Sequence, residues 1–177
     1  MSQNTMTLKE LKNYTEGPCV IVLIGPSGAG KSTLAEELAN EDHEIISSDQ
    51  FRELLSGDPT EQSVTGIVFQ MIYDTINVRS NYQCRTILDA TNLKRRDRKA
   101  YYGPVSEGIP SYAVLVDADE QTCKDRQHLR NRQVPEFVIE KHHNTFKHAK
   151  QNVVEETERW DGVFCYDTEE GVVEILR

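Results

Sequence analysis

The stretch CVIVLIGPSGAGKST, residues 19–33, decides the fold of this chain. Residues 19–25 are short, β-branched and without polar alternation, which is typical of a buried parallel strand. Residues 25–33 match the phosphate-binding pattern G-x-x-x-x-G-K-[ST]. A helix is expected directly afterwards, over residues 32–40. A chance glycine-rich turn would lack these flanking elements, so the order predicts a loop that binds a nucleoside triphosphate.

The residues of this loop each have a physical task. Glycines permit backbone angles and a close approach that a Cβ atom would prevent, so N–H groups can surround phosphate oxygens at the positive end of the following helix. Lys31 is expected to reach the β- and γ-phosphates, and the Ser32 hydroxyl is expected to bind Mg²⁺. The predicted cofactors are therefore ATP, or another nucleoside triphosphate, and Mg²⁺. The predicted nucleotide-binding residues are Gly25, Gly28, Ala29, Gly30, Lys31, Ser32 and Thr33.

The rest of the chain alternates between strand-like and helix-like segments. This alternation predicts an α/β fold, with a parallel sheet of about four to five strands and helices on both faces. Residues 1–177 are expected to form a single domain, with a polar N-terminal segment over residues 1–16. Further strands are expected at 43–47, 84–91, 111–118 and 163–167, and further helices at about 50–55, about 60–80, 119–132 and from Pro135 onward.

Composition and charge narrow the class of function. A net charge of −9 argues against a general nucleic-acid coat protein, which would carry a broad positive surface. Four scattered cysteines without a CxxC pair predict buried thiols in a reducing compartment. The sequence contains no apolar run long enough to span a bilayer and no signal-peptide core, so a cytoplasmic enzyme is expected.

Two carboxylates fall at the predicted carboxyl ends of strands, where open α/β sheets bind their ligands. Asp49 could accept the proton of a nucleophile, and Arg52 could bind a phosphate of the acceptor. The alternative is that Asp49 only caps a helix and Arg52 only pairs with it. Asp89 is expected to hold the metal through water or to orient the acceptor. The alternative for Asp89 is a turn formed with Thr91 and Asn92.

Basic residues are concentrated in two places. Arg126 and Arg130 are spaced to share a helix face, and Arg132 follows them. A mobile lid over about 126–136 that bears arginines would neutralise charge on a transferring phosphoryl group, whereas the alternative is a solvated face with surface ion pairs. The segment KRRDRK, residues 94–99, fits equally well a contact with an extended polyanion and an exposed helix face.

His142 lies on the apolar face of the helix expected after Pro135, so a packing role is expected rather than a ligand role.

The motifs GPSGAGKST, SSDQFR, LDATN and DRQHLRNRQVP, in this order, resemble those of the P-loop polynucleotide 5′-hydroxyl kinases, the kinase modules of nucleic-acid end-healing and repair enzymes. The resemblance covers about residues 18–150. The P-loop is common to many families, whereas D-x-x-R, D-[AS]-T-N and R-x-x-x-R before V-P are more discriminating. The resemblance implies a P-loop kinase-like fold with an arginine-bearing lid, and transfer of the ATP γ-phosphate to the 5′-hydroxyl of DNA or RNA.

The resemblance also implies a role for each matching residue. Asp49 would be the general base on the 5′-hydroxyl, and Arg52 would bind the acceptor phosphate next to the terminal nucleoside. Phosphatase or ligase activity would come from separate chains. The implied sets are Asp49, Lys31 and Arg130 for catalysis; Arg126 and Arg130, with Arg132 as a third, for the donor phosphates; Asp49, Arg52, Asp89 and Asn92 for the acceptor; and Ser32 and Asp89, through water, for the metal.

Two other functions remain open at this point. The first is a small-molecule kinase of similar topology that acts on a sugar, nucleoside or antibiotic, and the second is a nucleotide-dependent regulatory module without phosphotransferase chemistry. Arg52 and residues 94–99 favour a polyanionic acceptor over a small one, and the presence of Asp49 argues against the regulatory module.

Overall fold

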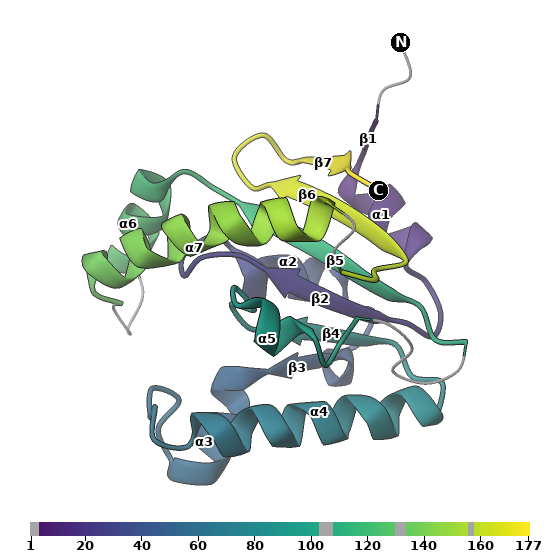
Figure 1. Ribbon diagram of the computed structural model, residues 1–177, viewed down its shortest axis with the longest axis horizontal. Helices are drawn as coiled ribbons and strands as arrows, with labels where there is room; N and C mark the ends of the chain where they lie inside the picture. The colour runs from purple at the N-terminus through teal and green to yellow at the C-terminus, as the bar shows by residue number, and fades with distance from the viewer. Residues whose placement is uncertain (1–3, 103–107, 130–133, 156–157) are drawn as a thin grey trace.

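The computed structural model describes residues 4–102, 108–129, 134–155 and 158–177, and a single sheet of seven strands runs through them (Figure 1). The strand order is β1-β7-β6-β5-β2-β4-β3. From β3 to β6 the neighbours are parallel, while β7 and β1 extend the sheet in antiparallel fashion. The strands are β1 (Thr5–Met6), β2 (Val20–Ile24), β3 (Ile45–Ser47), β4 (Thr86–Asp89), β5 (Ser111–Asp117), β6 (Gly162–Asp167) and β7 (Val172–Ile175).

Helices cover both faces of this sheet, as the alternating pattern predicts (Figure 1). Side chains of α4 and α7 pack with Val20, Val22 and Ile24 on one face, and those of α1 and α2 pack with Ile21 and Leu23 on the other. The α/β fold class is therefore confirmed. The helices are α1 (Leu8–Tyr14), α2 (Lys31–Leu38), the short 3-10 helix η1 (Asp42–Glu44), α3 (Ser48–Ser56), α4 (Thr65–Asn81), α5 (Arg95–Arg98), α6 (Glu120–His128) and α7 (Glu136–Val154).

The antiparallel edge is the main feature that the sequence did not predict. Strand β1 has two residues, and Thr5 and Met6 pair with Glu174 and Val173 of β7. Such a short strand shows no periodicity, and its partner lies at the other end of the chain, so only the tertiary structure reveals the pair. The polar N-terminal segment therefore contributes a strand and the helix α1, whose Leu11 is buried.

Two helix boundaries correct the sequence-based expectations. Helix α3 has Ser47 as its N-cap, and the Ser47 hydroxyl accepts a hydrogen bond from the Asp49 N–H at 3.2 Å. Asp49 therefore lies in the first turn of α3 and is not its cap. Helix α6 ends at His128, earlier than the predicted end at residue 132.

Three of the four cysteines are buried, as expected, whereas Cys84 is partly exposed. All four cysteines are free. Burial raises the pKa of Cys19, Cys123 and Cys165 to about 11, so these three thiols stay protonated at neutral pH. Among the described residues, the helices are all too short or too polar to cross a membrane.

The basic segment 94–99 has a split role in the fold. Arg98 has no exposed surface and forms an ion pair with Glu158, which is also fully buried. The Arg98 guanidinium also donates to the carbonyls of Asn92 and Leu93, and the Trp160 indole N–H donates to Glu158 at 2.9 Å. This network fixes the short helix α5 to the protein core. The other four basic residues of the segment are Lys94, Arg95, Arg96 and Lys99, and they are exposed.

We expect Arg98→Ala to lower the free energy of unfolding by about 3–5 kcal/mol, because it leaves the Glu158 carboxylate buried without its counter-charge. Urea denaturation followed by circular dichroism measures the change. Arg96→Ala is a matched control in the same helix, where the side chain is 78% exposed; its effect should stay within about 0.5 kcal/mol. Equal effects of the two variants would show that the buried pair does not anchor α5.

Candidate active site

The P-loop follows β2 and packs against β5 and α6 too closely for side chains at two of its glycines. A Cβ atom on Gly25 would lie 2.6 Å from the carbonyl oxygen of Val116, and one on Gly28 would lie 2.5 Å from that of Cys123. Gly28 also has a φ of +86°, which a residue with a Cβ rarely adopts. The loop is therefore held in one place by its neighbours, and glycine is required for that packing.

The end of the loop has the charge and polarity of an anion site. Helix α2 begins at Lys31 with Gly30 as N-cap and without a capping side chain, so backbone N–H groups of its first turn are directed at the loop. Lys31 is 7% exposed, and its ammonium donates to the Pro26 carbonyl at 2.7 Å inside the loop. A left-handed backbone, a helix N-terminus and a lysine together suit the phosphates of a nucleotide.

A hydroxyl and a carboxylate, those of the two residues predicted for the metal site, meet beside the loop. The Ser32 hydroxyl of α2 donates to the Asp89 carboxylate at the end of β4, at 2.7 Å. Mg²⁺ prefers oxygen ligands and keeps several waters, taking one or two carboxylates and the substrate phosphates besides. The described residues contain no cluster of three or more His, Cys, Asp or Glu side chains suited to a metal. Ser32 and Asp89 fit a Mg²⁺ ion shared with a bound nucleotide.

Sheet register brings Asp49 to the same edge. Ser47 of β3 pairs with Asp89 of β4, and Asp49 follows two residues later in the first turn of α3. The Asp49 side chain is 55% exposed, so its carboxylate is open to an incoming acceptor. The structure thus brings Asp49, Asp89 and the P-loop to one edge of the sheet, as the strand order predicts.

Arg52 is held next to Asp49 and is almost completely buried. Its Nη1 donates to the Asp49 carboxylate at 2.8 Å and to the Ser48 hydroxyl at 3.2 Å. Its Nε is buried without a hydrogen-bond partner among the described residues. A buried donor without a partner is unfavourable by about 1–3 kcal/mol, which an anion that reorients the guanidinium would recover. The ion pair between Arg52 and Asp49 agrees with the alternative in which Arg52 only pairs with Asp49. The Nε without a partner is not explained by that alternative.

Asn92 has a different position from the substrate contact predicted for it. Its side chain is 1% exposed, and its amide donates to the carbonyl of Leu23 at 2.8 Å. The residue has a φ of +48°, and this bond ties the turn after β4 to β2. The neighbouring Thr91 carbonyl accepts from the Gly25 N–H at 3.1 Å. The D-A-T-N turn therefore supports the P-loop, and the buried Asn92 side chain contributes to this support.

Of the arginines predicted for the lid, Arg126 can be placed. Its Nη1 donates to the Ala29 carbonyl at 3.1 Å and to the Thr168 hydroxyl, in the turn between β6 and β7, at 3.0 Å. The guanidinium thus lies against the P-loop, where donor phosphates are expected. Arg130 and Arg132 lie outside the described residues, and so does part of the predicted lid at 126–136.

His142 contacts the P-loop, although its sequence pattern predicts only a packing role. Its Nδ1 lies 3.1 Å from the Ser27 hydroxyl and accepts from the Ser27 N–H at 3.4 Å. Because a backbone N–H can only donate, the proton of the neutral ring is on Nε2. Burial lowers the pKa of His142 to about 4, and Lys31 adds to the shift. No local signal could reveal this contact, since it comes from α7 and joins segments far apart in the chain.

The family described as an AAA domain matches residues 20–152, well over half of the chain. The chain belongs to this AAA domain family. The matched residues include the P-loop, Asp49, Arg52, Asp89 and Arg126. No curated protein matches the sequence.

Solved structures share the fold of this AAA domain. A chain of the Pnkp1/Rnl/Hen1 RNA repair complex aligns with a TM-score of 0.65 and 22% identity over 77% of this chain and 46% of that one. A second structure of the Pnkp1/Rnl/Hen1 complex aligns at 0.53 and 22%, over 66% and 41%. A sugar kinase from Janibacter sp. HTCC2649 aligns at 0.53 and 22%, over 72% and 77%.

These similarities establish a P-loop kinase-like fold for the AAA domain. At such identities they show the fold alone, and they include proteins with different substrates. This chain spans less than half the length of the chains from the RNA repair complex.

The low pKa of His142 predicts a pH dependence of the stability of this AAA domain. Below its ordinary pKa of 6.5 the imidazole takes up a proton in the unfolded chain, but the folded protein resists protonation down to about pH 4. The free energy of unfolding should therefore fall as the pH decreases from 6.5 to about 4. In the variant His142→Ala this free energy should fall less steeply over the same pH range. Urea denaturation at several pH values measures both slopes. Equal slopes would show that the imidazole is not held neutral against the P-loop.

Proposed function

We propose that this protein is a polynucleotide 5′-hydroxyl kinase, which transfers the γ-phosphate of ATP to the 5′-hydroxyl end of DNA or RNA. The observation that carries the proposal is the pair formed by Asp49 and Arg52 on the same sheet edge as the P-loop. An exposed carboxylate suits the hydroxyl of an acceptor. The buried Arg52 guanidinium, whose Nε has no hydrogen-bond partner among the described residues, suits a phosphate. Every nucleic-acid end carries such a phosphate next to its terminal nucleoside.

In the proposed reaction the Asp49 carboxylate accepts the proton of the 5′-hydroxyl. The hydroxyl oxygen forms a bond to the γ-phosphorus of ATP, and the bond between that phosphorus and the β–γ bridging oxygen breaks. The products are a 5′-phosphorylated end, ADP and the proton that Asp49 later releases to water. Proton acceptance by a positioned carboxylate contributes about 10²- to 10⁴-fold to the rate of such reactions.

Cations around the P-loop would neutralise the negative charge of the ATP phosphates. Lys31 and the N–H groups of the P-loop and α2 would hold the donor phosphates, with Arg126 on the opposite side and Arg130 from the lid. Mg²⁺ bound at Ser32 and Asp89 would neutralise negative charge as it is transferred. We assign Asp89 to this task rather than to acceptor binding, since its carboxylate already accepts from Ser32.

The acceptor could be a nucleic acid or a small molecule. The fold similarity to a chain of an RNA repair complex agrees with a nucleic-acid acceptor, and the similarity to a sugar kinase agrees equally with a small one. Arg52 favours the first, because a neutral sugar offers no phosphate to a buried guanidinium. We further propose that residues 1–177 act as one kinase domain.

We expect Asp49→Asn to lower kcat on a 5′-hydroxyl oligonucleotide by about 10²- to 10⁴-fold, because the amide keeps the shape of the side chain but cannot accept the proton. Transfer from γ-labelled ATP measures the rate, and ATP affinity should be unchanged. Glu53→Gln is a matched control, since Glu53 is an exposed carboxylate in the same helix. Label that appears only on a sugar, nucleoside or antibiotic would refute the polynucleotide assignment. ATP binding without transfer to any acceptor would favour a regulatory module.

We expect Arg52→Ala to raise the KM for the oligonucleotide by about tenfold or more, since a hydrogen bond to a charged group contributes about 1.5–3 kcal/mol. The KM for ATP should change little. A second comparison isolates the phosphate contact: wild-type enzyme should prefer a nucleoside 3′-phosphate to the nucleoside, and Arg52→Ala should lose most of that preference. Equal increases in both KM values would count against the assigned contact.

A further inference from the structure

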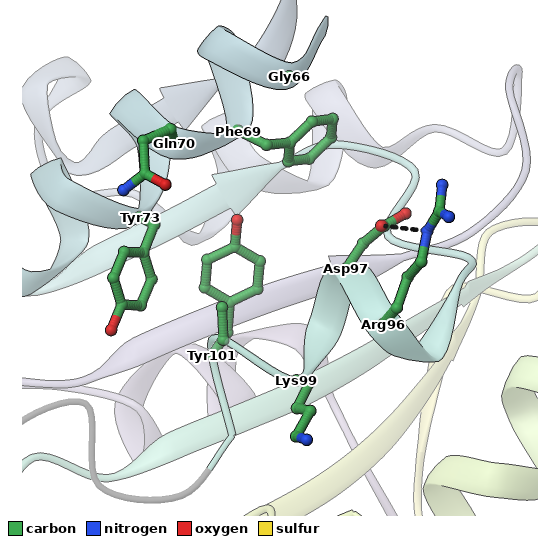
Figure 2. A pocket seen from close by; sticks show the side chains of 9 residues that line it. Gly66, Phe69, Gln70, Tyr73, Arg96, Asp97, Lys99 and Tyr101 are labelled. Atoms are coloured by element: carbon green, nitrogen blue, oxygen red, sulfur yellow. Dashed lines mark hydrogen bonds and ion pairs between the residues drawn. The ribbon is translucent and has the colours of Figure 1, made fainter.

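A groove lies between the first half of α4 and the segment that contains α5, and it has a volume of about 500 Å³ (Figure 2). We call it the α4–α5 groove. Its size falls within the range of binding sites for small molecules and single nucleotides. The residues that line it are Gly66, Phe69, Gln70, Tyr73, Arg96, Asp97, Lys99, Ala100 and Tyr101.

The lining combines aromatic rings with cations. Figure 2 shows Phe69 and Tyr73 of α4 facing the side that carries Tyr101 and α5. Tyr73 is 38% exposed, so its ring is available for contact, whereas Tyr101 is 1% exposed and forms the floor. Arg96 and Lys99 extend from the α5 side. Aromatic rings that stack on bases, beside cations that follow the backbone, are the elements with which proteins bind single-stranded nucleic acids.

The helices that form the groove are neighbours of the elements that carry the candidate active site. Helix α3, with Asp49 and Arg52, follows β3 and packs on α4. Helix α5 comes shortly after Asp89 at the end of β4, the neighbour of β3 in the sheet. The groove therefore begins on the acceptor side of the P-loop, where the rest of an acceptor strand would leave the site.

Charge also favours a polyanion at this position. The whole chain has a net charge of −9, yet the segment 94–99 presents four exposed basic residues around α5. The buried pair between Arg98 and Glu158 holds this helix in place, so the cations around it are presented on a fixed support. Asp97 lies 3.3 Å from Arg96, but Arg96 is 78% exposed, and such a pair is weak enough for a phosphate to displace it.

We propose that the α4–α5 groove binds the acceptor strand on the 3′ side of its terminal nucleotide, as single-stranded nucleic acid. Tyr73 and Phe69 stack on a base, and Arg96 and Lys99 contact backbone phosphates. This inference rests on the proposed function, and it deepens it: the enzyme would favour single-stranded or overhanging 5′ ends over a small acceptor.

The test compares a 5′-hydroxyl single strand of about ten nucleotides with a nucleoside 3′-phosphate. Tyr73→Ala should raise the KM for the strand about 5- to 20-fold, because one stacked base is lost, and it should leave the KM for the nucleoside 3′-phosphate unchanged. Tyr82→Ala is the matched control: this tyrosine directly follows α4, is 78% exposed, and does not line the groove. Equal KM values for the strand in all three proteins would overturn the inference.

Binding without catalysis separates the groove from the proposed reaction. Fluorescence anisotropy of a labelled strand, in the absence of ATP, measures the affinity over a range of salt concentrations. In the double variant R96A/K99A the slope of log K against log salt should fall by about 1.4, since each phosphate contact on a single strand accounts for about 0.7. Lys9→Ala, in α1 on the opposite face of the sheet, should leave the slope unchanged.

The outcomes of the two experiments are distinguishable. Strand binding that depends on Tyr73 and Arg96, in a protein that transfers no phosphate to the strand, would support the groove and refute the kinase proposal. Phosphorylation of the strand that is insensitive to every groove variant would refute the groove and leave the kinase proposal standing. A protein that neither binds nor phosphorylates the strand would overturn both.

Discussion

The five residues of β2 have no exposed surface, because the sheet surrounds the strand on both edges and helices cover it on both faces. Burial of this kind contributes roughly 1.5–3 kcal/mol for each large apolar side chain, so a displacement of the strand would be strongly unfavourable. The P-loop begins where β2 ends and inherits its position. Gly25 packs on Val116 and Gly28 on Cys123 so closely that a Cβ atom at either position would clash. Only glycine therefore suits these two positions of the phosphate-binding loop.

Sheet order then decides which side chains meet at the loop. Strand β2 lies between β4 and β5, and β3 lies beyond β4. This order places Asp89 next to Ser32 and sets Asp49 one strand further out. On the other side, α6 brings Arg126 against the loop. Under the proposed function, Asp49 would thus lie on the side of the acceptor and Arg126 on the side of the donor.

Buried charges position the less regular parts of the molecule. The Arg98–Glu158 pair anchors a helix of only four residues, which would not be stable alone. In a second network, Arg85 pairs with Glu44 at 2.7 Å and also donates to carbonyls of Thr15 and Leu38. Each guanidinium joins several chain segments through one planar group. Such a network of hydrogen bonds and ion pairs holds loops in place more specifically than a few apolar contacts would.

The P-loop, the parallel sheet and the sheet edge that carries Asp49 and Asp89 could be predicted from the amino-acid sequence. These features follow from local patterns: a β-branched run, glycines at set spacing and carboxylates at strand ends. Features that depend on contacts between distant residues could be seen only in the folded protein. They include the β1–β7 edge, the contact between His142 and Ser27, the buried position of Asn92 and the division of the segment 94–99 into one core arginine and four exposed cations. A residue's burial and partners come from the packing of elements far apart in the chain, and no local pattern records them.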